Sequence, residues 1–133
     1  MGWTKRSGIM LAKPLEERRL TNPKFGWSFP VLCQPKLDGE RCSAENHNGI
    51  SLLVTSEQNI FQSVPHINDA LEGLHTEELD GELYCHGMPF SEIHSRVSRT
   101  VNLHPDYQKI QYHIFDYKGE REANYERLID LKF

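Results

Sequence analysis

The run Lys36-Leu37-Asp38-Gly39-Glu40-Arg41 combines residue types that suit covalent chemistry on a phosphate. A lysine amine is a nucleophile once it has lost its proton, and partial burial beside other cations favours that neutral form. On a strand, Lys36 and Asp38 share one face, and Gly39 lets the backbone turn sharply or approach a ligand closely. The guanidinium of Arg41 offers a fork of donors that fits phosphate or a ribose edge. The alternative interpretation is a solvated hairpin tip whose charges form cross-strand ion pairs.

The spacing Lys-x-Asp-Gly-x-Arg resembles the nucleotidyltransferase signature of ATP-dependent DNA ligases, RNA ligases and mRNA capping enzymes. The stretch from Pro30 to Cys42, PVLCQPKLDGERC, is particularly similar to the DNA ligases of bacteriophages and related bacterial enzymes. By this resemblance Lys36 attacks the α-phosphate of ATP, which gives a lysyl-AMP phosphoramidate and pyrophosphate. Arg41 would contact the nucleotide or the phosphate at a nick. Gln34 and Leu37 of the same stretch would also line the nucleotide site.

A carboxylate motif follows at the place in the chain where the family has one. Leu79-Asp80-Gly81-Glu82-Leu83-Tyr84 resembles the family's second carboxylate motif. There the glutamate, here Glu82, binds the ribose hydroxyl and supports the metal-bound phosphate chemistry. A carboxylate suits both roles, because it accepts hydrogen bonds and is a hard oxygen ligand for Mg²⁺. Taken alone, Asp80-Gly81-Glu82 would indicate only a turn or a bulge.

An aromatic motif comes third. Tyr112-His113-Ile114-Phe115-Asp116-Tyr117 resembles the strand in which an aromatic residue of the family stacks on adenine. We expect Phe115 to fill this role, with Tyr117 as the second choice. A flat apolar ring binds a purine by stacking and demands few hydrogen bonds. The alternative for Phe115 is an ordinary core aromatic on a strand.

The resemblance covers the chain from about Met10 to Leu131 and implies an ATP-dependent DNA ligase of DNA replication, repair and recombination. ATP and Mg²⁺ are the expected cofactors, and nicked DNA is the expected partner. AMP would pass from Lys36 to a 5′-phosphate, and the 3′-hydroxyl would then displace it, mainly through positioning and charge neutralisation. An RNA ligase would act in the same way on another polynucleotide, and a capping enzyme would use GTP. A non-catalytic module that binds a nucleotide or DNA is the alternative from a different class.

Two features depart from the family pattern. In many ligases the strand after the lysine motif ends in Ser-Arg, whereas here Ser56 is followed by Glu57. A carboxylate at that point would repel a phosphate. The family's later Glu-Gly and Lys-x-Lys motifs and its OB-fold domain would follow Phe133. We therefore expect residues 1–133 to form a partial adenylation domain that adenylylates itself weakly, because those later lysines contact the α-phosphate.

The charge balance favours a local basic patch over a basic surface. The net charge is -4 and the isoelectric point is about 6.0, so contact with nucleic acid needs such a patch. On a predicted helix, Arg96 and Arg99 are the candidates for contact with a DNA backbone, although a solvated face fits equally well. Cys85, His86 and His94 match no standard zinc spacing, so ordinary histidines are the favoured interpretation.

The cysteine count and the hydropathy pattern bear on location. Three cysteines without paired spacing indicate free thiols in a reducing compartment. No apolar run is long enough to span a membrane, and the N-terminus has no secretory signal pattern. We expect a monomer in a bacterial cytoplasm or in the cytoplasm of a phage-infected host.

Apolar periodicity predicts an α+β fold with antiparallel β-sheets flanked by helices. The resemblance implies that this fold is part of a nucleotidyltransferase (ATP-grasp-like) domain. The expected strands are Phe29–Leu37, Arg41–Glu45, Ile50–Thr55, Glu78–Tyr84 and Gln111–Tyr117, with a turn at His47-Asn48-Gly49 and an antiparallel meander over Phe29–Thr55. The expected helices are Leu15–Leu20, Val64–Leu74, Phe90–Val97 and Asn124–Leu131, the last after a turn at Lys118-Gly119-Glu120.

Overall fold

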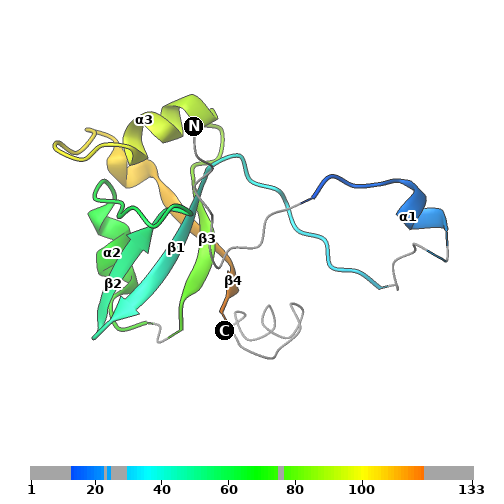
Figure 1. Ribbon diagram of the computed structural model, residues 1–133. Coiled ribbons are helices and arrows are strands. Elements are labelled where there is room, and N and C mark those ends of the chain that lie inside the picture. The colour runs from blue at the N-terminus through cyan, green and yellow to red at the C-terminus, as the bar shows by residue number, and fades with distance from the viewer. Residues whose placement is uncertain (1–12, 23, 25–29, 75–76, 119–133) are drawn as a thin grey trace.

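The fold is α+β, with one antiparallel sheet of four strands and helices packed on it (Figure 1). A computed structural model describes residues 13–22, 24, 30–74 and 77–118. The strands lie in the order β2-β1-β3-β4. In chain order the elements are α1 (Arg18–Thr21), β1 (Glu40–His47), β2 (Ile50–Val54), α2 (Pro65–Leu71), β3 (Leu79–Tyr84), α3 (Phe90–Val97), the short 3-10 helix η1 (Tyr107–Lys109) and β4 (Gln111–Tyr117).

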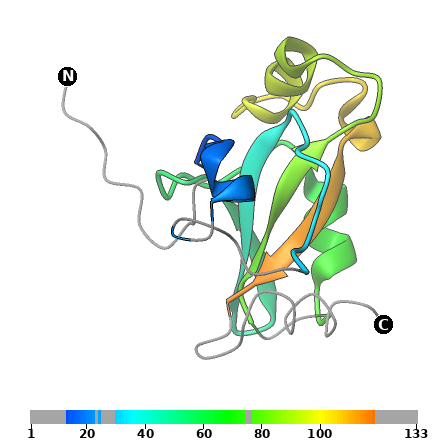
Figure 2. The same ribbon diagram turned by 90° about the vertical axis from the view of Figure 1, so that its right-hand side faces the viewer.

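One face of the sheet is buried beneath α2 and α3, and Figure 2 looks onto the opposite face, which we call the open face. Period-two alternation explains the division, since buried and half-buried residues alternate along the whole of β3. The helices contribute apolar residues at spacings of three and four, which place them on one side of each helix. The buried core consists of Cys42, Ala44, Leu53, Phe61, Val64, Ile67, Leu71, Leu79, Leu83, Ile93, Val97 and Ile110.

The hairpin between β1 and β2 follows from the pair Asn48-Gly49. Both residues have positive φ, 53° and 87°, which a two-residue turn between twisted antiparallel strands requires. Asparagine and glycine tolerate this backbone conformation better than other residues. The turn fixes the register, in which His47 pairs with Ile50 and Ser43 with Val54.

A bulge interrupts the pairing of β3 with β4. Asp80 pairs with Asp116 and Gly81 with Ile114, so Phe115 is the extra residue on β4. On the buried face, the ring of Tyr112 packs directly on Gly81, where an added Cβ would lie 2.6 Å from Cε2 of the ring. The hydroxyl of Tyr112 donates to the carbonyl of Cys42 on β1, at 2.8 Å, and so links β4 to β1 across β3.

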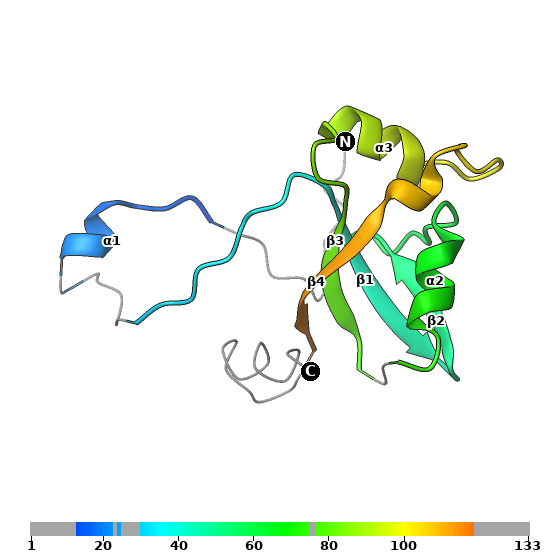
Figure 3. The same ribbon diagram turned by 180° about the vertical axis from the view of Figure 1, so that it is seen from behind.

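The strand predicted over Phe29–Leu37 is wrong for the described residues 30–37, which form no regular secondary structure, and Phe29 lies outside the described residues. Both ladder positions beside β1 are taken, by β2 and β3, so the expected pairing of this segment with β1 has no free edge. Pro30 and Pro35 also lack the N–H that a ladder needs. Figures 1 and 3 show the segment leaving the start of β1 on the open side of the sheet. We call residues 30–39 the lysine segment.

Most other expected elements are confirmed. The predicted Phe90–Val97 and Gln111–Tyr117 agree with α3 and β4 residue for residue, and the predictions for β1, β2 and β3 differ by at most two residues at either end. Two helices are shorter than expected: α1 covers four residues, and α2 ends before Gly73, which has a φ of 75°. The expected turn at residues 118–120, beyond Lys118, and the expected helix at residues 124–131 lie outside the described residues. Among the described residues, no helix has the length and apolar character needed to cross a membrane.

We predict that Gly81→Ala lowers the free energy of unfolding by about 3 kcal/mol, because the new Cβ has no room. It would lie 2.5 Å from the carbonyl oxygen of His113, which is backbone and cannot rotate away. Urea unfolding measures the loss. Gly49→Ala is the control, since Gly49 has a positive φ but nothing within 4 Å of an added Cβ. The control should cost about 1 kcal/mol, and an equal loss in both variants would contradict the packing argument.

Candidate functional site

The lysine segment meets β3 at Gly39, and only glycine fits there. An added Cβ would lie 2.2 Å from the carbonyl oxygen of Leu83 and 3.0 Å from Cγ of Glu82. This close approach lets the backbone N–H of Gly39 donate to the carboxylate of Glu82. It also brings Lys36, three residues earlier, within electrostatic range of the same carboxylate. Gly39 of the lysine motif therefore allows the backbone that carries Lys36 to run close to Glu82 of the carboxylate motif.

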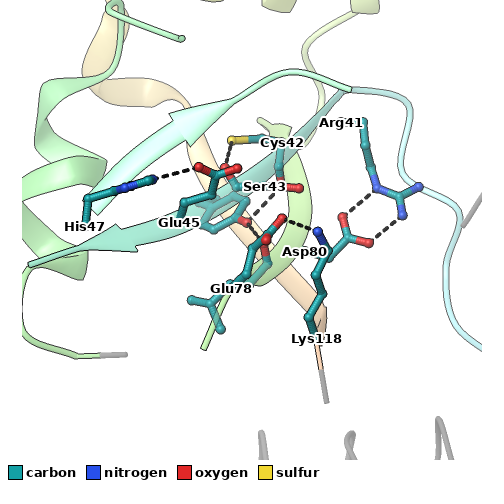
Figure 4. A network of polar contacts seen from close by, with 10 residues as sticks. Arg41, Cys42, Ser43, Glu45, His47, Glu78, Asp80 and Lys118 are labelled. Atoms are coloured by element: carbon teal, nitrogen blue, oxygen red, sulfur yellow. Dashed lines mark hydrogen bonds and ion pairs between the residues drawn. The ribbon is translucent and has the colours of Figure 1, made fainter. Parts of the chain in front are cut away.

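Arg41 connects three strands on the open face. From β1, its Nε and Nη2 donate to the two carboxylate oxygens of Asp80 on β3, at 2.7 and 2.5 Å (Figure 4). The carbon of its guanidinium also lies 4.9 Å from the ring centroid of Phe115 on β4. Both partners of the ion pair are largely buried, with side chains 25% and 16% exposed. A bidentate pair of this kind is directional, and it holds the guanidinium in one orientation.

Burial raises the pKa of Glu82 above the ordinary value of a glutamate. The cations Arg41 and Lys36 and the N–H of Gly39 act in the opposite direction, because they favour the carboxylate form. Glu82 pairs across the ladder with Arg41 on one side and with His113 on the other. A half-buried carboxylate with cations around it is suited to accept hydrogen bonds from hydroxyl groups, or to bind a metal ion that also holds a phosphate.

Phe115 reaches the site through the β-bulge. The extra residue on β4 lies beside Arg41 on the open face, and the ring is half-buried. The guanidinium covers one face of the ring, so a purine stacks on that face only if Arg41 moves aside. Tyr84 and His113 lie nearby on the same face of the sheet, with ring centroids 5.5 Å apart.

The remaining residues of the lysine segment are more exposed than expected. Gln34 and Lys36 are exposed and Leu37 is half-buried. The expectation that Lys36 and Asp38 share one face of a strand is wrong, because no strand forms there. The partial burial expected for Lys36 is likewise absent. Its charge still favours the carboxylate form of Glu82, because the backbone at Gly39 runs against that residue.

The candidates for DNA contact and the departure at Glu57 lie outside this cluster. Glu57 is exposed in the turn after β2, where its N–H donates to Oγ1 of Thr55. Arg96 on α3 has a side chain only 11% exposed, while Arg99, just after α3, is exposed. The two arginines therefore differ in their access to a ligand.

The metal expected at Glu82 would need ligands beyond the side chains that the structure describes. Within the described ranges, no three His, Cys, Asp or Glu residues gather as a metal site would require. Asp80, the nearest carboxylate along β3, is engaged by Arg41. Glu82 is thus the carboxylate suited to Mg²⁺, which proteins often hold with one or two carboxylates together with substrate phosphates.

The sequence interpretation omitted Asp80 as the partner of Arg41. Asp80 and Glu82 alternate with the buried Gly81 and Leu83, so the strand pattern already placed both carboxylates on one face. In the register of β1 with β3, Glu82 lies directly opposite Arg41. The guanidinium nevertheless binds Asp80, which lies diagonally across the ladder, and only the structure shows this choice. The contact between the rings of Tyr84 and His113 was also missed, and nothing in the local sequence indicates it.

Comparison with known proteins adds no relative. The chain matches no protein-family model, and no curated protein resembles it significantly in sequence. Any assignment of function therefore rests on the motifs and on their geometry.

We predict that Glu82→Gln stabilises the fold at pH 7. Since the pKa of Glu82 is raised chiefly by burial, its charged form costs stability, and this cost appears as the pH rises through the folded-state pKa. Glutamine carries no charge, and its amide oxygen still accepts from the N–H of Gly39. Urea unfolding of both proteins measures the difference, which should shrink as the pH falls below the ordinary glutamate value of 4.5. A variant less stable than the wild type at pH 7 would refute this account.

We predict that Asp80→Asn lowers the free energy of unfolding by about 1.5–3 kcal/mol, because it removes a charge-assisted bidentate partner from a largely buried guanidinium. Glu78→Gln is the control. It breaks the pair with Lys118, whose side chain is 46% exposed, and should cost less than about 1 kcal/mol. Equal losses in the two variants would mean that the Arg41–Asp80 pair has no special role.

Proposed function

We propose that the chain belongs to the adenylation domain of an ATP-dependent DNA ligase. The single observation that supports this most strongly is the convergence of three separate motifs on one face of the sheet. Lys36 is within electrostatic range of Glu82, Arg41 lies opposite Glu82, and Phe115 lies beneath Arg41. Each motif alone has an ordinary structural explanation. A chance match would not require Gly39 of the lysine motif to lie against Glu82, or Arg41 of the same motif to lie over Phe115.

In the proposed reaction the amine of Lys36 forms a bond to the α-phosphorus of ATP. The bond from that phosphorus to the bridging oxygen breaks, pyrophosphate leaves, and the amine proton passes to solvent. Arg41, together with Mg²⁺ held near Glu82, would neutralise negative charge on the phosphates. Glu82 would accept a hydrogen bond from the ribose, and Phe115 would stack on adenine. The adenylate would then pass to the 5′-phosphate of nicked DNA, and the 3′-hydroxyl would displace it.

The exposure of Lys36 supports one alternative function. An exposed lysine and an arginine that both act on one carboxylate are an ordinary arrangement for reversible phosphate binding. A module that binds a nucleotide or DNA without covalent chemistry would use the same four side chains, Lys36, Arg41, Glu82 and Phe115. The formation of a stable adduct distinguishes the two functions.

We predict that incubation with ATP and Mg²⁺ adds one adenylate to the chain, and that Lys36→Ala abolishes the addition. Intact-mass spectrometry after prolonged incubation detects the adduct, and peptide mapping locates it. Lys24→Ala is the matched control, because Lys24 is another exposed lysine and should leave labelling unchanged.

Two outcomes would contradict the ligase proposal. Labelling by GTP but not by ATP would favour a capping-type enzyme. Saturable binding of ATP without any covalent product would favour the reversible module.

A further inference from the structure

A second cluster of charged groups lies where α3 approaches η1. We call it the basic corner and define it as Arg96, Arg99, His104, Asp106 and Lys109. One carboxylate oxygen of Asp106 forms two ion pairs: it lies 3.6 Å from Nη2 of Arg96 and 3.3 Å from Nζ of Lys109. The corner therefore contains three permanent cations and one carboxylate. It carries excess positive charge in a chain whose net charge is -4.

Arg96 is the largely buried cation of the basic corner, and it holds Asp106 in place. Its side chain is 11% exposed, and its Nη1 also donates to the backbone carbonyl of Glu92, at 2.9 Å. Because both terminal nitrogens of its guanidinium are engaged, this arginine fixes the position of Asp106 and has little surface left for a ligand. The side chain of Lys109 is 62% exposed and its contact with Asp106 is at the protein surface, so a stronger anion could displace it.

Arg99 is the most available cation of the corner. It is exposed, follows Arg96 by three residues, and has no ion-pair partner within the described part of the chain. Its charge reaches His104, whose pKa is lowered first by desolvation and then by the surrounding cations, while Asp106 opposes them. The imidazole thus experiences a positive environment although a carboxylate is adjacent.

The basic corner lies at the same end of the sheet as the lysine segment. Tyr84, at the end of β3, pairs with Gln111, which follows η1 closely. One residue earlier, Leu83 pairs with Glu40 at the start of β1. A polymer bound at the corner would therefore run past the end of the sheet from which the lysine segment emerges (Figure 2).

We propose that the basic corner binds the phosphate backbone of a DNA duplex through Arg99 and Lys109, and that Asp106 limits the affinity by competing for Lys109. The identity of the polyanion as DNA rests on the proposed function. Contacts of this kind carry no sequence preference, weaken with salt, and hold a duplex in register beside a reactive site. The DNA phosphates replace the carboxylate of Asp106 as the partner of Lys109.

The test measures binding of the whole chain to a nicked, 5′-phosphorylated duplex by fluorescence anisotropy, without ATP, across a salt series. Arg99→Gln and Lys109→Gln should each weaken binding about fivefold to tenfold near 0.1 M salt, and each should reduce the slope of log K against log salt by about 0.9. Asp106→Asn should strengthen binding several-fold. The matched controls Lys118→Gln and Glu45→Gln alter charge at the opposite end of the sheet and should have little effect.

Asp106→Asn should strengthen DNA binding, whereas Arg99→Gln and Lys109→Gln should weaken it. Comparison with the distant controls then distinguishes binding at the basic corner from a general effect of net charge. Losses equal to those of the Lys118 control, or unchanged binding in Asp106→Asn, would overturn the proposal. Arg99 is exposed, so its variant tests the corner even if Asp106→Asn perturbs folding, which thermal unfolding would reveal. Because no ATP is present, failure to form an adenylate leaves this result unaffected, and loss of DNA binding leaves the adenylylation test intact.

Discussion

The open face of the sheet is organised around the guanidinium of Arg41. It donates two hydrogen bonds to Asp80 on β3 and lies over the ring of Phe115 on β4. One side chain from β1 therefore sets the relative positions of groups on three strands. The β-bulge is necessary for this arrangement, because the extra residue places Phe115 beside the arginine. Strand pairing alone would leave these groups on neighbouring strands without a fixed geometry.

Sequence reasoning succeeded where structure is determined locally. The Asn48-Gly49 turn, the strand around Glu82 and the apolar spacing of α3 each depend on a few neighbouring residues, and each was predicted correctly. The strand over residues 29–37 failed because a ladder requires a free edge, which depends on where β3 lies. For the same reason, the partner of Arg41 could not be chosen from the sequence. The choice between Asp80 and Glu82 depends on the geometry across two strands.

The site shows the electrostatic cost that binding functions often impose. Burial raises the pKa of Glu82, so its charge opposes folding, while two cations partly compensate. Arg41 is meanwhile committed to Asp80 and to the ring of Phe115. A nucleotide that offered phosphates to the cations and a hydroxyl to Glu82 would use groups whose present partners lie within the protein. Its affinity would be the difference between the new contacts and those it replaces.

Helix α3 connects the open face with the basic corner. Glu40 alternates with Arg41 along β1, so its side chain is directed to the helix-covered side of the sheet. There it contacts His94 of α3, whose ring stacks on Phe90. The residue before Glu40 is Gly39, whose N–H binds Glu82, and the last turn of the same helix carries Arg96. Movement of α3 would therefore displace both the base of the lysine segment and the support of Asp106. In this arrangement, a duplex at the basic corner and a nucleotide on the open face would both depend on the position of α3, which would couple them without direct contact between them.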